Sequence, residues 1–150
     1  MLVLLPIRGE LRYSDLQAVL FGTCPRPANL PEWMEYQQNP PHGRLVEDIY
    51  NGSSIFLCAS LSEGWGLPPA EAMSCGCAAV STDNGGVRDY AIHGETALLS
   101  PPEDPQVLAD NLNRVLNDGT LRTKLARQGN EYIQEFNWNR AVQAMADFIG

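Results

Sequence analysis

The sequence predicts an α/β fold in which a Rossmann-like parallel sheet has helices packed against it. Short apolar runs alternate along the chain with segments of helical periodicity, which is typical of βαβ units. Glycine, proline and asparagine follow most of these runs and mark turns. The length of 150 residues fits one domain, and 44% hydrophobic with 19% charged residues is ordinary for a globular protein.

The predicted strands are apolar runs bounded by turn residues, and the predicted short helices lie between them. Strands are expected at residues 17–22, 34–38, 54–59, 77–81 and 96–100. Short helices are expected at residues 44–50, 68–75 and 87–92. The second of these begins at a proline pair, which suits the first helical turn, and Gly76 is expected to end it.

The last third of the chain is predicted to be helical. A first helix after Pro105 has one apolar face, made of Val107, Leu108, Leu112, Val115 and Leu116. A second continues through Leu121, Leu125, Ile133 and Phe136, with Gly129 as its weak point. Asn137 is suited to cap a final helix whose apolar side is Ala141, Val142, Met145 and Phe148. Trp138 is expected to pack between helices or to contact another domain.

Composition excludes several classes of protein. The net charge of −8, with one lysine and nine arginines, argues against binding to nucleic acid. No apolar run approaches the roughly 18 residues of a membrane span, and residues 1–6 are too few, without a basic start, for a signal peptide. The four cysteines form no C-x-x-C pair, which favours reduced core thiols in a cytosolic protein.

The most informative stretch is residues 63–71, here called the glutamate segment. It follows the predicted strand at 54–59 and has Glu63 and Glu71 at its two ends. Two glycines let the backbone approach a ligand, and N–H groups at a helix start attract an anion. Carboxylates accept hydrogen bonds from hydroxyls. A ligand with a negative middle and hydroxyls at both ends, such as a nucleotide-sugar, fits this pattern.

The same residues also have interpretations that need no ligand. Glu71 lies in the first helical turn, where the helix dipole favours a carboxylate by about 0.3–1 kcal/mol. Glu63 fits a solvated loop, and Trp65 fits either a packing residue or a lid beside a sugar. If the sheet is parallel, the segments after three strands, at residues 39–41, 62–67 and 84–86, should share the edge at which the strands end.

The residues of the glutamate segment resemble the E-x7-E signature of the group 1 (family 4) glycosyltransferases. The likeness continues in order through residues 80–89 and 93–105, and it spans at least residues 44–145. Members of this family adopt the GT-B fold. The resemblance therefore implies that the chain is the C-terminal, donor-binding half of a GT-B glycosyltransferase.

The resemblance also implies a reaction and a set of site residues. The reaction is a retaining transfer of a sugar from a nucleotide-diphosphate sugar to an acceptor that the sequence does not identify. Glu63 is the candidate catalytic residue, with a front-face route assisted by the donor's phosphate as the alternative to its acting as a nucleophile. The implied donor-binding residues are Glu63, Gly64, Trp65, Gly66, Leu67 and Glu71, with Glu63 at the sugar and Glu71 at the ribose.

Asn39, Pro40 and Leu45 would border the base. No cofactor and no metal are expected, because GT-B enzymes need no bound metal and the chain has no D-x-D motif. Arg8 and Arg12 lie near the place where the family has an arginine and a lysine against the diphosphate. Each is either a phosphate ligand or an exposed arginine on a helix.

The chain is expected to be a single domain, residues 1–150, truncated at its N-terminal side. The partner that completes the active site would be the N-terminal, acceptor-binding GT-B domain. The expected location is the cytoplasm, with peripheral membrane attachment of the full-length protein left open.

Two functions remain open at this point. The chain is either the donor-binding part of an enzyme or a non-catalytic nucleotide-sugar binding module. A dinucleotide oxidoreductase is disfavoured, since no G-x-G-x-x-G follows an early strand.

Outside the glutamate segment, the glycine pair at 85–86 is expected to shape a tight loop. Arg88 is expected to lie at the surface and His93 to serve a turn, while His42 has no clear assignment.

Overall fold

The structure is a computed structural model that describes residues 2–5, by their backbone, and residues 16–150. The described strands form one six-stranded sheet of order β3-β2-β1-β4-β5-β6. Their bounds are β1 Leu2–Leu5, β2 Gln17–Gly22, β3 Met34–Gln38, β4 Ile55–Cys58, β5 Ala78–Thr82 and β6 Ala97–Ser100. The strands predicted from residue 17 onward are confirmed.

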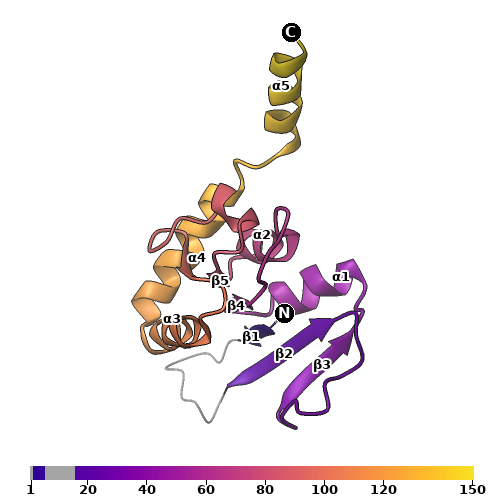
Figure 1. Cartoon of the computed structure of the whole chain (residues 1–150), viewed down its shortest axis with the longest axis vertical. Coiled ribbons are helices and arrows are strands. Elements are labelled where there is room, and N and C mark those ends of the chain that lie inside the picture. The colour runs from indigo at the N-terminus through magenta and orange to yellow at the C-terminus, as the bar shows by residue number, and fades with distance from the viewer. Residues whose placement is uncertain (1, 6–15) are drawn as a thin grey trace.

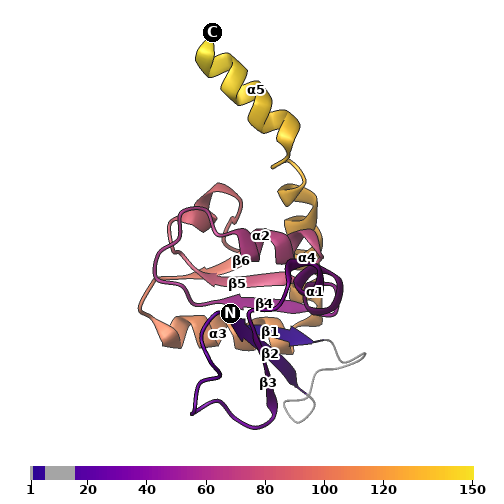
Figure 2. The ribbon, with the colours of Figure 1, turned by 90° about the vertical axis from the view of Figure 1, so that its right-hand side faces the viewer.

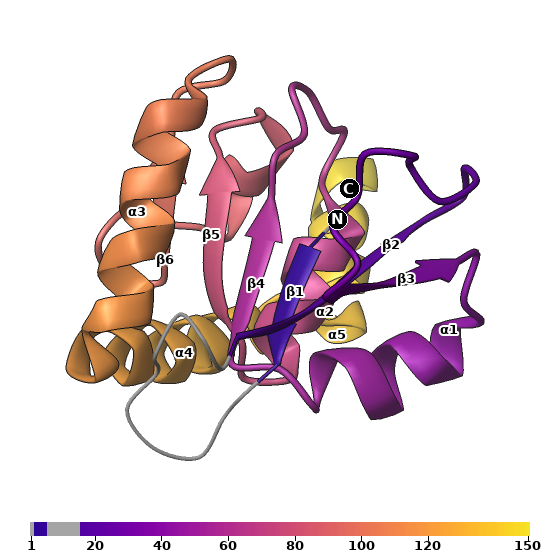
Figure 3. The same ribbon diagram turned by 90° about the horizontal axis from the view of Figure 1, so that it is seen from below.

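Most neighbouring strands are parallel, but β1 is not. β4, β5 and β6 pair in parallel, as do β2 and β3, whereas β1 is antiparallel to both β2 and β4. Because β1 opposes both neighbours, the other five strands point the same way and end at one edge, here called the carboxyl edge. Figure 3 shows β4 and β5 pointing together toward the loops that follow them. The predicted parallel sheet is thus confirmed for five strands, and sequence analysis missed the antiparallel β1, because four apolar residues show no period that identifies a strand.

The helices follow the predicted order, with two corrections at their ends. They are α1 His42–Arg44, continued by π-helical turns η2 Leu45–Tyr50, then α2 Leu67–Ser74, the 3₁₀ turn η3 Gly86–Asp89, α3 Pro105–Asn117, α4 Gly119–Ile133 and α5 Trp138–Ile149. The first helix starts at residue 42, since Pro41 is its N-cap. The predicted helix at 87–92 stops after Asp89, because the Ile92 N–H donates instead to the Thr96 hydroxyl, at 2.8 Å.

The two faces of the sheet are covered by different helices (Figure 2). On one face, Ile55, Val80 and Leu98 pack against Leu108 of α3 and Leu125 of α4. On the other face, η2 and α2 cover a cluster of Val19, Phe21, Ile49, Tyr50, Phe56, Cys58, Ala72 and Cys77. A third cluster joins α2 to the C-terminal end of α4 through Met73 and Ile133. These buried contacts hold the start of α2 at the carboxyl edge.

Gly129 is a packing position in α4 and not the weak point that its residue type predicts. The helix runs unbroken from Gly119 to Ile133. A Cβ atom at Gly129 would lie 2.8 Å from the Thr96 carbonyl oxygen and 3.1 Å from Met73 Cε. Asn130, the next residue, donates to the carbonyl oxygens of Met73 and Ser74. The glycine therefore lets α4 approach α2 closely.

The final helix extends away from the sheet (Figure 1). Asn137 caps it as predicted, since its side chain accepts from the Arg140 N–H at 3.1 Å. The side predicted to be apolar is exposed, and Phe148 retains 88% of its accessible surface. Trp138 is 84% exposed, so it does not pack between helices. In the described part of the chain, none of the helices has both the length and the apolar character that crossing a membrane requires.

The cysteines are free thiols, and only part of the prediction for them is correct. Cys58 and Cys77 are buried in the cluster between the sheet and the helices η2 and α2, as expected of core thiols. Cys75 is half-buried and Cys24 is exposed, so these two are not core residues. Cys24 lies in the proline-rich connection between β2 and β3.

Candidate functional site

The glutamate segment starts at the carboxyl edge, where β4 ends. The Glu63 N–H donates to the Asn84 carbonyl oxygen at 3.0 Å, and Glu63 forms a parallel bridge with Gly85. The two loops meet because β4 and β5 are parallel neighbours. The predicted common edge for residues 62–67 and 84–86 is therefore confirmed. Glu63 is half-buried, and its carboxylate is at the sheet end of the segment.

The contact between these two loops is tightest at Gly86. A Cβ atom there would lie 2.7–2.8 Å from the backbone N, Cα and C atoms of Trp65. The buried Asn84 side chain accepts from the Val87 N–H at 3.2 Å, which holds the loop in its turn. The glycine pair thus shapes a tight loop, as predicted, and the loop supports the glutamate segment from one side.

The middle of the segment turns sharply at Gly66, where α2 begins. Gly66 has φ +83° and ψ 67°, in the left-handed region that favours glycine, and is the N-cap of α2. Its carbonyl oxygen accepts a hydrogen bond from the buried Tyr90 hydroxyl at 2.7 Å. Sequence reasoning missed Tyr90. A buried tyrosine needs a partner for its hydroxyl, but the sequence does not show that this partner is the Gly66 carbonyl, 24 positions earlier.

The far end of the segment is Glu71, on α2. Its Oε1 atom lies 3.0 Å from His42 Nε2, at the start of α1. The Glu71 side chain is 28% exposed and that of His42 is 70% exposed. One carboxylate oxygen is thus engaged at the surface, which leaves lone pairs on Glu71 for a ligand hydroxyl.

Buried groups surround the inner side of Glu71. Burial first, and the Glu71 charge second, raise the pKa of the Tyr50 hydroxyl well above its ordinary value. The same two causes raise the pKa of the Cys75 thiol, and burial raises the pKa of Cys77 to about 12. The Tyr50 hydroxyl interacts electrostatically with Glu71 without reaching hydrogen-bond geometry. At neutral pH these neighbours are uncharged, so they add no negative charge beside the carboxylate.

The residues predicted to border a base lie next to this end of the segment. Asn39 has φ +47° and its N–H donates to the Gly22 carbonyl oxygen at 2.7 Å, which turns the chain after β3. Pro40 leads from that turn to His42, and Leu45 packs on the core cluster beneath η2. The His42–Glu71 contact thus places the 39–45 connection beside the glutamate segment. The prediction that the turn after β3 shares the carboxyl edge is confirmed.

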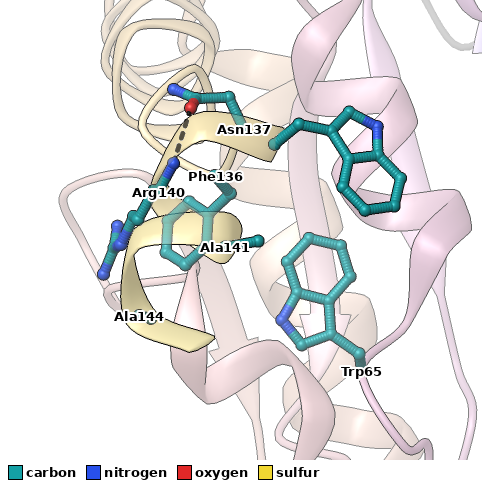
Figure 4. Close-up of a pocket in the computed structure, with 7 residues that line it drawn as sticks. Trp65, Phe136, Asn137, Arg140, Ala141 and Ala144 are labelled. Carbon is teal, nitrogen blue, oxygen red and sulfur yellow. Dashed lines mark hydrogen bonds between the residues drawn. The ribbon is translucent and has the colours of Figure 1, made fainter. Parts of the chain in front are cut away.

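Trp65 packs on a group of aromatic rings. Its ring centroid lies 4.8 Å from that of Tyr90 and 5.9 Å from that of Phe136. These rings adjoin a pocket of about 530 Å³, which is lined by Trp65, Phe136, Asn137, Trp138, Arg140, Ala141 and Ala144 (Figure 4). The walls contain no carboxylate, and the Arg140 guanidinium stacks over Phe136 at 4.6 Å. The pocket therefore offers no carboxylate to accept hydrogen bonds from ligand hydroxyls, whereas the glutamate segment offers two.

The remaining sequence-predicted residues lie elsewhere. Arg8 and Arg12 fall outside the described residues, so their predicted phosphate role stays untested. His93 Nδ1 accepts from the Leu99 N–H at 2.9 Å, which gives His93 the turn role expected of it. Arg88 is exposed and pairs with Asp83.

The Asp83–Arg88 pair predicts a measurable effect of pH. The hydrogen bonds from the Arg88 side chain, at 2.7 and 3.0 Å, lower the pKa of Asp83 below its ordinary value. The pair therefore stabilises the fold above the pKa of Asp83 in the unfolded chain, and this stability is lost as the pH falls through its lower pKa in the folded chain. We expect Arg88→Gln to raise the pKa of Asp83 toward its ordinary value in a carboxyl NMR titration. Arg127→Gln, on α4, is the control, and an unchanged pKa in Arg88→Gln would show that Arg88 is not the cause.

Comparison with known proteins decides the family. The sequence profile described as "Glycosyl transferases group 1" matches residues 28–132, which include the whole glutamate segment. The chain belongs to the group 1 glycosyltransferases. The match also covers the 84–86 loop, Tyr90 and His42, and it ends before α5.

Individual relatives agree with this assignment. A D-inositol 3-phosphate glycosyltransferase of Xylanimonas cellulosilytica is 32% identical over 108 residues, which are 72% of this chain and 26% of that protein. This group 1 glycosyltransferase chain thus spans about a quarter of the length of the curated relatives it matches. Sucrose-phosphate synthase of Thermosynechococcus elongatus superposes with a TM-score of 0.71, at 30% identity over 81% of this chain and 30% of the other.

The fold comparison extends to more distant glycosyltransferases. A structure of Anabaena HepE in complex with UDP and glucose has a TM-score of 0.69 and 21% identity, and covers 79% of this chain and 32% of HepE. The predicted α/β fold of a GT-B C-terminal domain is confirmed by these neighbours. In this group 1 glycosyltransferase chain the glutamate segment lies at the carboxyl edge, where parallel α/β sheets bind their ligands.

Proposed function

We propose that this chain supplies the donor site of a retaining glycosyltransferase that uses a nucleotide-diphosphate sugar. The observation that carries the proposal is the glutamate segment itself. Two carboxylates flank a glycine turn at the N-terminus of α2, and the turn is fixed against the 84–86 loop. Backbone N–H groups at a helix start favour an anion, and flanking carboxylates favour hydroxyls.

The two glutamates and the backbone between them have separate proposed roles. Glu71 binds the ribose hydroxyls, and Glu63 binds hydroxyls of the donor sugar. The backbone of residues 64–67 holds the sugar and the diphosphate, and residues 39–45 border the base. The His42–Glu71 hydrogen bond supports this order, because it holds the 39–45 connection beside Glu71, the residue proposed to bind the ribose.

The proposed chemistry needs no metal, because backbone amides and the α2 dipole face the diphosphate. Retention of the anomeric configuration has two routes. Either Glu63 attacks the anomeric carbon and expels the nucleoside diphosphate, and the acceptor hydroxyl then displaces Glu63 while its proton passes to the expelled diphosphate, or the acceptor enters on the face from which the diphosphate leaves. In the second route the leaving phosphate takes the acceptor's proton, and Glu63 binds and orients the sugar.

Titration with candidate nucleotides and nucleotide-sugars would identify the base and the sugar of the donor. HepE is a distant structural neighbour with bound UDP and glucose, so UDP-glucose is the first donor to test. We expect calorimetry in EDTA to detect binding of one among UDP, GDP and ADP, and of its sugar derivative. Glu63→Ala should weaken the nucleotide-sugar more than the bare diphosphate. Equal losses for both ligands would contradict the assigned roles, and no binding of any of the three would contradict the donor site.

A second expectation follows from the fact that the chain spans only about a quarter of the length of its curated relatives. We expect the 150-residue chain to bind a donor weakly and to transfer no sugar to an acceptor, since GT-B enzymes complete the site with a second domain. Acceptor glycosylation by the purified chain would contradict this. Binding without transfer even in a longer protein would favour the alternative, a non-catalytic nucleotide-sugar binding module.

A further inference from the structure

The Tyr90 hydroxyl lies beneath the turn of the glutamate segment. Tyr90 follows η3 and has no exposed surface. Its hydroxyl donates to the Gly66 carbonyl oxygen at 2.7 Å, while its ring packs on Trp65. Burial, as the largest cause, raises the pKa of Tyr90, so the hydroxyl keeps its proton and remains a donor at neutral pH.

The carbonyl that Tyr90 holds is otherwise weakly restrained. Among the described residues, this carbonyl oxygen accepts one other hydrogen bond, from the Ala70 N–H at 3.5 Å, which is long for a first helical turn. Gly66 is in the left-handed region, and a glycine backbone has more conformational freedom than any other residue. The tyrosine hydroxyl is therefore the main restraint on the Gly66–Leu67 peptide.

The orientation of this peptide decides where the Leu67 N–H points. In a trans peptide the N–H is directed opposite to the preceding carbonyl. Because the Gly66 carbonyl faces the buried Tyr90, the Leu67 N–H faces away from the aromatic rings. As the first residue of α2, Leu67 has no carbonyl one turn earlier in the helix to accept from its N–H. The Leu67 side chain is 62% exposed, so this side of the helix start is open.

We propose that Tyr90 is a positioning residue of the donor site: its hydroxyl fixes the Gly66–Leu67 peptide so that the Leu67 N–H is presented to the diphosphate. This role rests on the proposed function, and it adds a residue outside the glutamate segment. It is separate from the packing role of the ring, since phenylalanine would supply the ring alone. It acts at the diphosphate and not at the ribose, which Glu71 binds.

The test distinguishes the role of the Tyr90 hydroxyl from that of its ring, and binding of the diphosphate from binding of the ribose. We expect Tyr90→Phe to weaken UDP and UDP-glucose by about three- to tenfold, the usual worth of one hydrogen bond, with no change for uridine. Calorimetry measures the first two and an NMR titration the third. If GDP or ADP is the better ligand of the wild-type chain, that nucleotide and its nucleoside replace UDP and uridine. A role in stability alone would leave the ratio of diphosphate to nucleoside affinity unchanged.

Tyr36→Phe is the matched control, because the Tyr36 hydroxyl donates to the Cys24 carbonyl away from this segment. A second measurement needs no variant: the Leu67 amide resonance of the wild-type chain should shift when UDP is added and stay in place with uridine. Wild-type affinity for UDP in Tyr90→Phe, or a Leu67 resonance that does not move, would overturn the role of Tyr90 and leave the donor site standing. Failure of the wild-type chain to bind UDP, GDP or ADP would overturn both.

Discussion

Replacing Glu71 by alanine is expected to weaken every ribonucleotide that the chain binds, by about 10- to 100-fold. The physical reason is the loss of the charge-assisted hydrogen bond to the ribose, since one such bond is worth about 1.5–3 kcal/mol. Glu71 is 28% exposed and pairs with the exposed His42, so its removal leaves no buried charge without a partner. Calorimetric titration of UDP, GDP and ADP measures the effect, and the fold should remain intact in a thermal melt.

Two variants make this result specific. Glu47→Ala removes one negative charge from the exposed side of η2 and should bind nucleotides as the wild-type chain does. Glu71→Gln keeps the shape and one acceptor oxygen without the charge, so an intermediate affinity is expected. If deoxyribonucleotides lost as much affinity as ribonucleotides in Glu71→Ala, the ribose assignment would be wrong.

A methyl group at position 86 should have the largest effect on the fold of the site. Gly86→Ala places Cβ 2.7–2.8 Å from three backbone atoms of Trp65, and these cannot rotate away as a side chain can. Gly86 is not at positive φ, so alanine fits the backbone conformation itself and the contact alone accounts for the cost. Overpacking of this kind costs about 1–3 kcal/mol. Urea unfolding measures it, and donor affinity should fall as the glutamate segment shifts.

Gly43→Ala is the matched control for this substitution. Gly43 lies in α1, where a Cβ atom would meet nothing within 4 Å. Alanine inside a helix is favoured over glycine by about 0.5–1 kcal/mol, so this variant should be as stable as the wild-type chain or more so. If Gly86→Ala were as stable as the wild-type chain, the 84–86 loop and the Trp65 backbone would have to be farther apart than the structure shows.

The outline of the fold could be predicted from local pattern. Alternating apolar runs located strands β2 to β6, and Pro105 and Asn137 marked the starts of two helices. Strand β1 was missed because four apolar residues carry no period. Gly129 was misjudged because its contact, the Thr96 carbonyl, is 33 positions away in the sequence. Such a contact forms only when α4 packs on the sheet.

The candidate site, like the fold, could be predicted from the sequence only in part. Both glutamates and both glycines of the segment could be selected from their spacing, because a nine-residue stretch contains them all. His42 and Tyr90 could not, since each acts through a hydrogen bond to a residue 24 or more positions away. The exposure of Trp138 was equally undecidable, because the apolar side of α5 looks the same whether or not another surface covers it.

The sequence by itself determined the class of fold and the E-x7-E segment, since both are encoded by neighbours along the chain. Only the tertiary structure decided how that segment is held. The parallel pairing of β4 and β5 brings the 84–86 loop against Trp65, and the burial of Tyr90 beneath Gly66 sets the direction of the peptide that begins α2. The physical reason is that hydrogen bonds and steric contacts depend on distance in space, which the order of residues does not specify until the sheet has formed.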